Sequence, residues 1–149
     1  MILTIFDLLL VPLYFVLIYF VSGYVQQKKI VKEPLYKWYR KGLMVKLLGA
    51  IAVCLIYQFY YAGGDTSNYY ITTKAIVSLF SRDSGVFWKV YLYGESTREN
   101  YSYFDSNALP VYWWDAGALF VSRLILPLYF ISFQSFIAMS MLLSWMCYS

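Results

Sequence analysis

Residues 47–64 read LLGAIAVCLIYQFYYAGG, eighteen consecutive residues without a charge. A helix needs about 20 mainly apolar residues to cross the hydrocarbon core of a bilayer. The apolar run extends backwards to Leu43, and the long stem of Lys46 can reach the membrane surface. The aromatic residues from Tyr57 to Tyr61 are typical of a helix that emerges at a membrane interface. The stretch therefore predicts a transmembrane helix over residues 43–61.

A second apolar run, residues 1–22, reads MILTIFDLLLVPLYFVLIYFVS and contains a single charge, that of Asp7. The alternative is a cleaved signal peptide, which would need a basic start and a cleavage site of small residues. This run has an acidic residue near its start, and the bulky residues Tyr24 and Val25 follow it. We therefore predict an uncleaved transmembrane helix over residues 1–22, in which Pro12 is a candidate for a kink.

The composition agrees with a membrane protein. Of the 149 residues, 61% are hydrophobic and 22% aromatic, whereas 13% are charged. Three spans would already use about 60 residues, at about 20 residues each. We expect an all-α, polytopic integral membrane fold that leaves little chain for a soluble core.

The absence of histidine from the sequence excludes several kinds of chemistry. Ser-His-Asp and Cys-His nucleophiles, histidine metal sites and imidazole proton shuttles all need that ring. Cys54 and Cys147 lie in separate apolar stretches and are expected to be buried hydrophobic residues rather than metal ligands or a disulfide. We predict no cofactor, while the scattered carboxylates neither demand nor forbid a metal.

Charge distribution predicts the topology. The segment 23–42 has one acid, Glu33, and six bases: Lys28, Lys29, Lys32, Lys37, Arg40 and Lys41. By the positive-inside rule this loop is cytoplasmic, which places the Met1 end and residues 62–116 outside. The alternative for the lysines is a specific contact with anionic lipid head groups or a phosphorylated substrate.

The outer segment 62–116 begins with Gly63-Gly64-Asp65-Thr66. Asp65 or Thr66 can cap a helix here, and an exposed carboxylate could also act as a general base or orient an acceptor hydroxyl. We predict a surface helix over about 66–80 that lies along the outer membrane surface. Its expected apolar face consists of Tyr69, Thr73, Ile76, Val77 and Phe80.

Aromatic residues crowd the rest of this segment, and they suit either anchoring at lipid head groups or packing against sugars. The polar stretch 93–100 is expected to be an exposed loop tip without chemistry. Asp115 is a second candidate helix cap, and Arg123 follows two turns later. Arg123 either snorkels to the surface or binds a phosphate of a lipid-linked substrate.

Residues 117–149 allow two interpretations. In the first, which we favour, residues 116–131 form an interfacial helix and residues 134–149 begin a third span. In the second, two short helices cross as a hairpin at 132–135. Arg123 is expensive at membrane depth, and about 16 residues are few for a crossing. The chain ends within an apolar run, so we expect it to be the N-terminal part of a longer protein.

The pattern resembles the start of the exopolysaccharide polymerase (EpsG/Wzy-like) membrane proteins. Two spans flank a short basic loop, and the second span ends in aromatic residues. After it come Gly63, Asp65 and Tyr69, which match a G-x-D-x-x-x-Y string of that family. Arg123 resembles an arginine that precedes the next hydrophobic stretch. The match covers the chain but only a fraction of a family member.

The resemblance implies a bacterial inner-membrane glycosyltransferase that joins polyprenyl-linked oligosaccharides at the outer face. It implies catalytic roles for Asp65, on the acceptor hydroxyl, and for Arg123, on the leaving phosphate. It further implies substrate contacts by Tyr69, Trp113, Trp114 and Asp115. The expected partners are the lipid bilayer, the polyprenyl-linked oligosaccharide and other membrane subunits, and no nucleic acid.

Two other functions remain open. A non-catalytic scaffold subunit of an envelope or secretion complex would leave Asp65 as a mere cap. A transporter or channel component would normally place ionisable groups within its spans, where this chain has only Asp7 and Lys46 near the ends.

Overall fold

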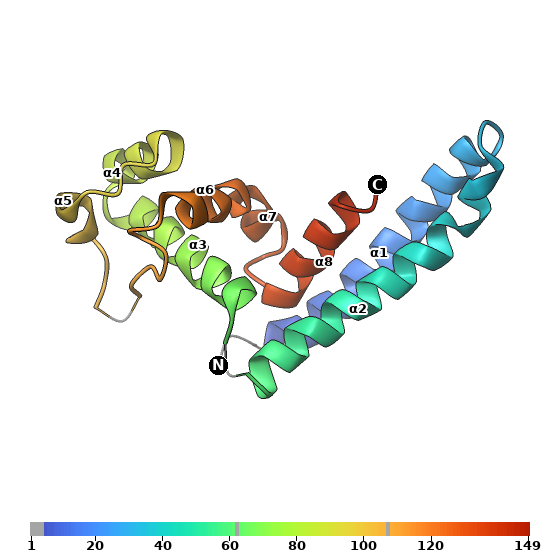
Figure 1. The fold of residues 1–149 in the computed structure, drawn as a ribbon, viewed down its shortest axis with the longest axis horizontal. Coiled ribbons are helices and arrows are strands. Elements are labelled where there is room, and N and C mark those ends of the chain that lie inside the picture. Colours follow the sequence, from blue (N-terminus) through green and yellow to red (C-terminus); the bar gives the residue numbers. More distant parts are fainter. Residues whose placement is uncertain (1–4, 62, 107) are drawn as a thin grey trace. The chain divides into compact units, whose positions relative to one another are not determined.

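The computed structural model describes residues 5–61, 63–106 and 108–149. Every regular element in these residues is helical, which confirms the predicted all-helical class (Figure 1). The chain divides into two compact units. We call residues 5–60 with 135–149 the hairpin unit, and residues 61–134 the aromatic unit.

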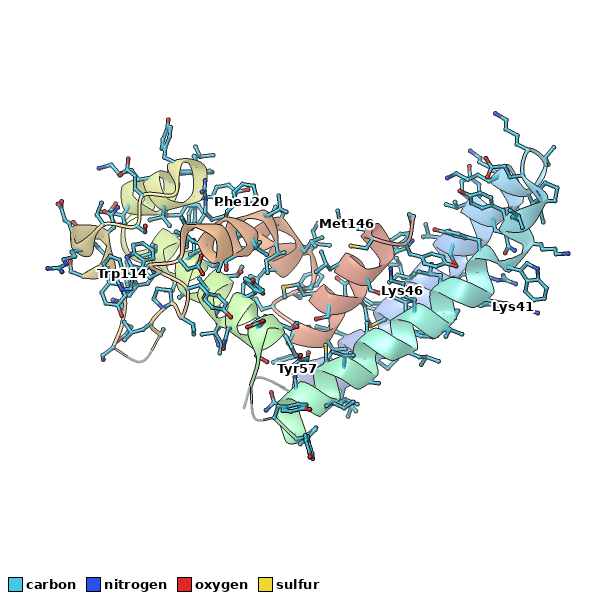
Figure 2. All side chains as sticks on the ribbon, in the orientation of Figure 1. Lys41, Lys46, Tyr57, Trp114, Phe120 and Met146 are labelled. Carbon is cyan, nitrogen blue, oxygen red and sulfur yellow. The ribbon has the colours of Figure 1, made fainter. Side chains whose placement is uncertain are left out.

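The hairpin unit is built from two long helices. Helices α1 (Ile5–Ile30) and α2 (Tyr39–Phe59) run antiparallel, and the short 3-10 helix η1 (Pro34–Trp38) connects them (Figure 1). Helix α8 (Phe136–Met146) packs against both. Lys41 lies near the turn between α1 and α2, and Tyr57 lies at the other end of α2 (Figure 2).

Helix α1 corrects the predicted boundaries, because it continues to Ile30 instead of ending at residue 22. Gln and Lys are good helix formers, and Lys28 and Lys29 in the last turn interact favourably with the helix dipole. The residue before a proline disfavours the helical conformation, and Glu33 before Pro34 is extended. The predicted loop 23–42 is therefore mostly helical.

Two segments are long and apolar enough to cross a membrane, Ile5–Ile30 and Pro34–Phe59. Only 22% and 17% of their most apolar stretches are buried. Each helix buries one narrow stripe, which contains Ile18 in α1 and Leu43 and Leu47 in α2. Outside the stripes the apolar side chains are exposed, as in Leu8 at 77% and Phe20 at 70%.

The last part of the chain breaks where both interpretations expected it, at residues 132–135. Helix α7 (Leu126–Ile131) ends before this turn, in which Phe133 and Gln134 have positive φ angles. Ser135 then caps α8 by accepting a hydrogen bond from the Ala138 N–H at 3.1 Å. At 11 residues, α8 is shorter than the 17 or so that a crossing needs.

The aromatic unit is a cluster of short helices around α3 (Asp65–Arg82). Along the chain follow α4 (Ser84–Trp88), the π-helix η2 (Lys89–Tyr93), α5 (Arg98–Tyr101), α6 (Ala116–Leu124) and α7. Helices α4, α6 and α7 all pack against α3. The segment 116–131 is thus two helices rather than one, because Pro127 at the start of α7 has no N–H to continue α6.

This unit has a hydrophobic core of its own, whereas from the sequence we expect little chain to be left for such a core. The core contains Ile76 and Leu79 from α3, Val90 from η2, Leu119 from α6 and the fully buried Trp113. Helix α3 was also expected to expose its apolar face to a membrane. Instead it is the central helix of the unit, since Thr73 and Ile76 of the predicted face are completely buried under its neighbours.

The polar stretch 93–100 is more ordered than a loop tip. Thr97 caps α5 by accepting a hydrogen bond from the Asn100 N–H, and the buried Asn100 amide donates to the Glu95 carbonyl oxygen. Gly94 ends η2 in the left-handed region, with a φ of 72°, where a side chain would be strained. These contacts fold the stretch back on itself, and the indole N–H of the core residue Trp113 donates to the Thr97 carbonyl oxygen.

Candidate functional site

Asp65 does not have the predicted capping role. It is the first residue of α3, Gly64 occupies the cap position, and no side chain accepts a hydrogen bond there. The chain reaches this point through Gly63, whose φ of 147° favours glycine. The exposed carboxylate of Asp65 is therefore directed to a different partner.

That partner is Tyr112, whose hydroxyl donates to Asp65 Oδ1 at 2.8 Å. The Asn68 side-chain amide donates to the same hydroxyl at 3.4 Å, and the Tyr69 and Tyr112 ring centroids are 5.0 Å apart. The backbone of Tyr112 is held in turn, because its N–H donates to the buried Thr72 hydroxyl of α3. We call Asp65, Asn68, Tyr69 and Tyr112 the Asp65 cluster.

The electrostatics of the cluster centre on the phenol. The Asn68 hydrogen bond lowers the pKa of Tyr112, but partial burial together with the bond and the charge of Asp65 raises it more. The phenol pKa therefore lies above its ordinary value, and Tyr112 stays a neutral donor at physiological pH. A carboxylate fixed in this way beside two rings can accept a hydrogen bond from a ligand hydroxyl.

Arg123, the second predicted catalytic residue, is engaged elsewhere. Its Nε donates to the Tyr91 carbonyl oxygen and its Nη2 to the Leu92 carbonyl oxygen, both at 2.6 Å. These carbonyls belong to the end of η2, where a cation also interacts favourably with the helix dipole. The guanidinium lies so close to Gly94 that an added Cβ would be 2.4 Å from Nη1. The observed role of Arg123 is to close η2 against α6.

The two tryptophans predicted to contact sugar have different environments. Trp113 has no exposed surface, its indole N–H donates to the Thr97 carbonyl oxygen, and Phe104 packs edge-on at 4.9 Å. Trp113 is thus part of the core in this structure, and the substrate contact expected for it stays an untested prediction. Trp114 is 62% exposed and contacts the ring of Tyr101.

Asp115 has the capping role predicted for it. Its Oδ1 accepts hydrogen bonds from the Gly117 and Ala118 N–H groups, both at 3.0 Å, and so starts α6. The structure brings Asp65 and Tyr69 together through Tyr112. Asp115, Trp114 and Arg123 share no hydrogen bond or ring contact with that cluster among the described residues.

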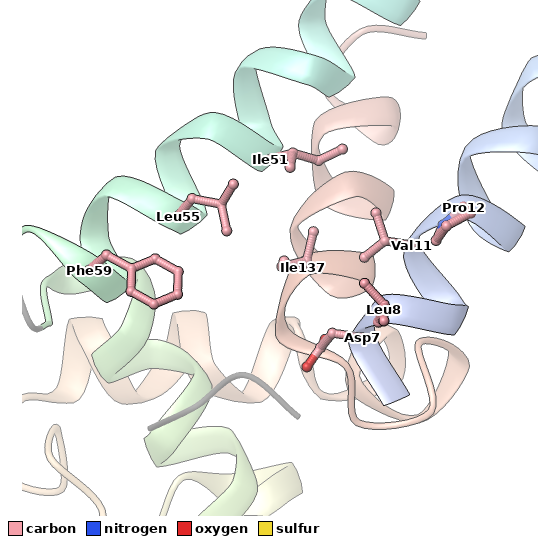
Figure 3. Close-up of a pocket in the computed structure, with 8 residues that line it drawn as sticks. All are labelled: Asp7, Leu8, Val11, Pro12, Ile51, Leu55, Phe59 and Ile137. Carbon is pink, nitrogen blue, oxygen red and sulfur yellow. The ribbon is translucent and has the colours of Figure 1, made fainter. Parts of the chain in front are cut away.

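A cavity with a volume of about 350 Å³ lies in the hairpin unit. Its lining residues come from three helices: Asp7, Leu8, Val11 and Pro12 of α1, Ile51, Leu55 and Phe59 of α2, and Ile137 of α8 (Figure 3). Asp7 is buried and accepts a hydrogen bond from the Ser135 hydroxyl. Because Ser135 also caps α8, this carboxylate fastens the start of α8 to α1.

Sequence reasoning missed the two partners that organise these carboxylates. Tyr112 is one of many aromatic residues in its segment, and its pairing with Asp65 spans 47 positions. Ser135 was noted only as part of a turn, and it lies 128 positions from Asp7. No local signal connects residues so far apart in the chain.

The described residues contain no group of three or more acidic or cysteine side chains placed to hold a metal ion. No protein-family model, curated protein or solved structure matches the chain. The resemblance to the exopolysaccharide polymerases therefore stays a prediction.

Proposed function

We propose that the chain is an integral membrane protein in which α1 and α2 span the bilayer. The supporting observation is the exposure of their apolar side chains, because water-soluble proteins seldom expose such large continuous apolar surfaces. The positive-inside rule then assigns the basic turn between them to the cytoplasm of a bacterial cell and the aromatic unit to the outer face.

We further propose that the aromatic unit serves glycosyl transfer from a polyprenyl-linked oligosaccharide. The observation that carries this proposal is the Asp65 cluster. It combines an exposed carboxylate, not used as a helix cap, with a neutral phenol donor and the Tyr69 ring. Aromatic rings pack on the C–H faces of sugars, while a carboxylate accepts hydrogen bonds from their hydroxyls.

In the proposed step Asp65 acts on the acceptor. The acceptor hydroxyl oxygen forms a bond to the anomeric carbon, and the bond from that carbon to the pyrophosphate oxygen breaks. The hydroxyl proton passes to the Asp65 carboxylate, and the lipid pyrophosphate leaves with the bonding electron pair. Tyr112 positions the carboxylate through its hydrogen bond to Oδ1. Arg123 is not part of this step, because its guanidinium binds backbone carbonyl groups.

The test measures the length distribution of lipid-linked polysaccharide in cells that carry variants of the chromosomal gene. Asp65→Asn removes the proton acceptor but keeps the shape, and we expect a loss of long chains of about 100-fold or more, as for a general base. Tyr112→Phe removes only the positioning bond and is expected to have a smaller effect.

The matched control is Asp105→Asn. Asp105 is an exposed carboxylate of the same unit that forms an ion pair with Arg82, and such surface pairs contribute little. The amount of each variant in the membrane is measured in parallel. Normal chain length with Asp65→Asn at normal abundance would rule out the catalytic role.

The second candidate is a non-catalytic scaffold subunit. One observation favours it, namely that Arg123 and Trp113, two residues expected to meet the substrate, are used to build the unit. For a scaffold, Asp65→Asn leaves polysaccharide length unchanged, whereas substitutions that unfold the aromatic unit abolish assembly of the complex.

A further inference from the structure

The aromatic unit carries an apolar groove that the proposed function does not use. It has a volume of about 480 Å³ and is lined by Phe80 of α3, Phe87 and Trp88 of α4, Tyr91 of η2, and Leu126, Pro127 and Phe130 of α7. Rings build much of its wall, with Phe80 edge-on to Phe87 and Tyr91 stacked on Phe87. None of these seven residues carries a formal charge.

The rim of this groove is exposed although it is strongly apolar. Phe80 is 54% exposed, Trp88 47% and Phe130 51%. The same elements expose further apolar side chains, Leu92 of η2 and Ile131 of α7 among them. An apolar patch of this kind on a soluble surface marks a contact with a partner or a membrane.

The segment 84–93, which forms one wall of the groove, has a polar cleft on its other side. Phe87, Trp88 and Tyr91 line the groove, whereas Gly85, Val86 and Lys89 line the cleft. Each of these groove residues lies two positions after a cleft residue, Phe87 after Gly85, Trp88 after Val86 and Tyr91 after Lys89. Two positions correspond to about 200° around a helix with 3.6 residues per turn. The segment is therefore amphipathic.

The cleft has a volume of about 240 Å³ and, unlike the groove, is lined mainly by charged and polar side chains. Its lining includes the charged residues Asp83, Lys89, Glu95 and Glu99 and the buried amide of Asn100. Charged groups of this density stay in water. One side of segment 84–93 thus requires water and the other side avoids it.

We infer that the groove face rests in the bilayer interface, with the groove residues at the boundary of head groups and acyl chains and the cleft facing water. Tryptophan and tyrosine favour this depth because their rings are apolar and their edges polar. A helix with one apolar and one charged side lies in the interface plane in the same way. This inference rests on the membrane insertion proposed above, but not on the glycosyl transfer.

The connections to the hairpin unit favour the bilayer over another protein as the occupant. Five residues, 60–64, separate the end of α2 from α3, and four residues, 132–135, separate α7 from α8. A chain extends by at most about 3.6 Å per residue, so α3 begins within about 20 Å of the end of a span. With α2 in the bilayer as proposed, the chain length alone keeps the start of α3 near the membrane surface, where lipid is always present.

Quenching by brominated lipids tests this inference on the full chain. The protein is placed in nanodiscs of phosphatidylcholine and phosphatidylglycerol, with or without lipid brominated near the top of the acyl chain. We expect Trp88→Phe to reduce the lipid-quenched part of the tryptophan emission. The matched control, Trp114→Phe, removes a tryptophan outside the groove that is even more exposed than Trp88, at 62% against 47%, and should leave that part unchanged.

A second measurement leaves Trp88 in place. In a chain with Cys54→Ala and Cys147→Ser, one cysteine is introduced by Phe130→Cys or, as the control, by Ser102→Cys at an exposed polar position. A charged maleimide should label Ser102→Cys in nanodiscs at least tenfold faster than Phe130→Cys. Unfolding in dodecyl sulfate should make the two rates equal.

The outcomes separate this inference from the proposed insertion. If alkaline carbonate extracts the chain from membranes, the insertion is wrong and the inference fails with it. If the chain stays in the membrane while Trp88 is not quenched and Phe130→Cys reacts as fast as the control, the groove is open to water. Slow labelling without quenching would mean that a second copy or another protein covers it. Either result would overturn the inference.

Discussion

The two units use apolar residues in opposite ways. In the hairpin unit most apolar side chains of α1 and α2 are exposed, as Leu8 is at 77%. In the aromatic unit the largest of the fully buried side chains, Trp113, packs among residues of the unit itself. Apolar character alone therefore does not show whether a residue is exposed or buried in the fold. The comparison predicts that equivalent truncations have different costs in the two units.

The largest effect is expected from Trp113→Ala. Removing a fully buried tryptophan leaves a cavity and costs about 3–5 kcal/mol of unfolding free energy. Leu8→Ala removes an exposed side chain of α1 and should change the stability of the chain in detergent micelles by less than about 0.5 kcal/mol. Chemical unfolding, monitored separately in each unit by hydrogen exchange, measures both stability changes.

Trp114→Ala is the control for Trp113→Ala, because it truncates the neighbouring exposed ring. It should cost far less than the buried position. Equal costs for the two tryptophans would contradict the described core.

The second effect concerns the closure of η2 by Arg123. Arg123→Ala removes two hydrogen bonds from a charged donor to backbone carbonyls, which is worth about 1.5–3 kcal/mol. Lysine cannot form the same fork, so Arg123→Lys should recover only part of this stability. Thermal unfolding provides the measurement. If Arg123 instead bound a substrate phosphate, both variants would keep wild-type stability and lose only activity.

A smaller difference is expected between the two aspartates that were both predicted as caps. Asp115→Ala removes the cap of α6 and should cost about 1 kcal/mol. Asp65→Ala removes no cap and should cost less than half as much. Unfolding free energies of the two variants decide the point, and an equal loss would restore the capping role of Asp65.

The smallest expected effect is a change in the pKa of Tyr112. NMR of the protein with labelled tyrosine measures this pKa. Asp65→Asn should lower the pKa of Tyr112, because a carboxylate charge disappears. Asn68→Ala should raise it, because a hydrogen bond to the phenolate is lost. Two shifts in the same direction would refute the described cluster.

The same pKa has a consequence for stability. Because the folded-state pKa of Tyr112 lies above the ordinary value of 10.0, its contribution to folding is complete below about pH 10. The contribution is lost as the pH rises through the folded-state pKa. Tyr112→Phe should remove this one contribution to the pH dependence of stability.

Local patterns predicted much of the helical structure. The expected surface helix 66–80 lies within α3, Asp115 caps α6, and the chain turns at 132–135. These features depend on hydropathy, capping residues and turn residues within a few positions. The candidate site was only partly predictable, because the capping rule suits Asp65 as well as Asp115 and does not reveal Tyr112.

The sequence alone determined that the chain is helical and that two segments are long and apolar enough to cross a membrane, because helix formation and hydropathy depend on neighbouring residues. Only the tertiary structure decided that α3 lies inside a packed unit, that Trp113 belongs to its core and that Arg123 closes η2. Those roles depend on contacts between residues far apart in the chain. An apolar or charged side chain has the same local signature whichever partner the fold brings to it.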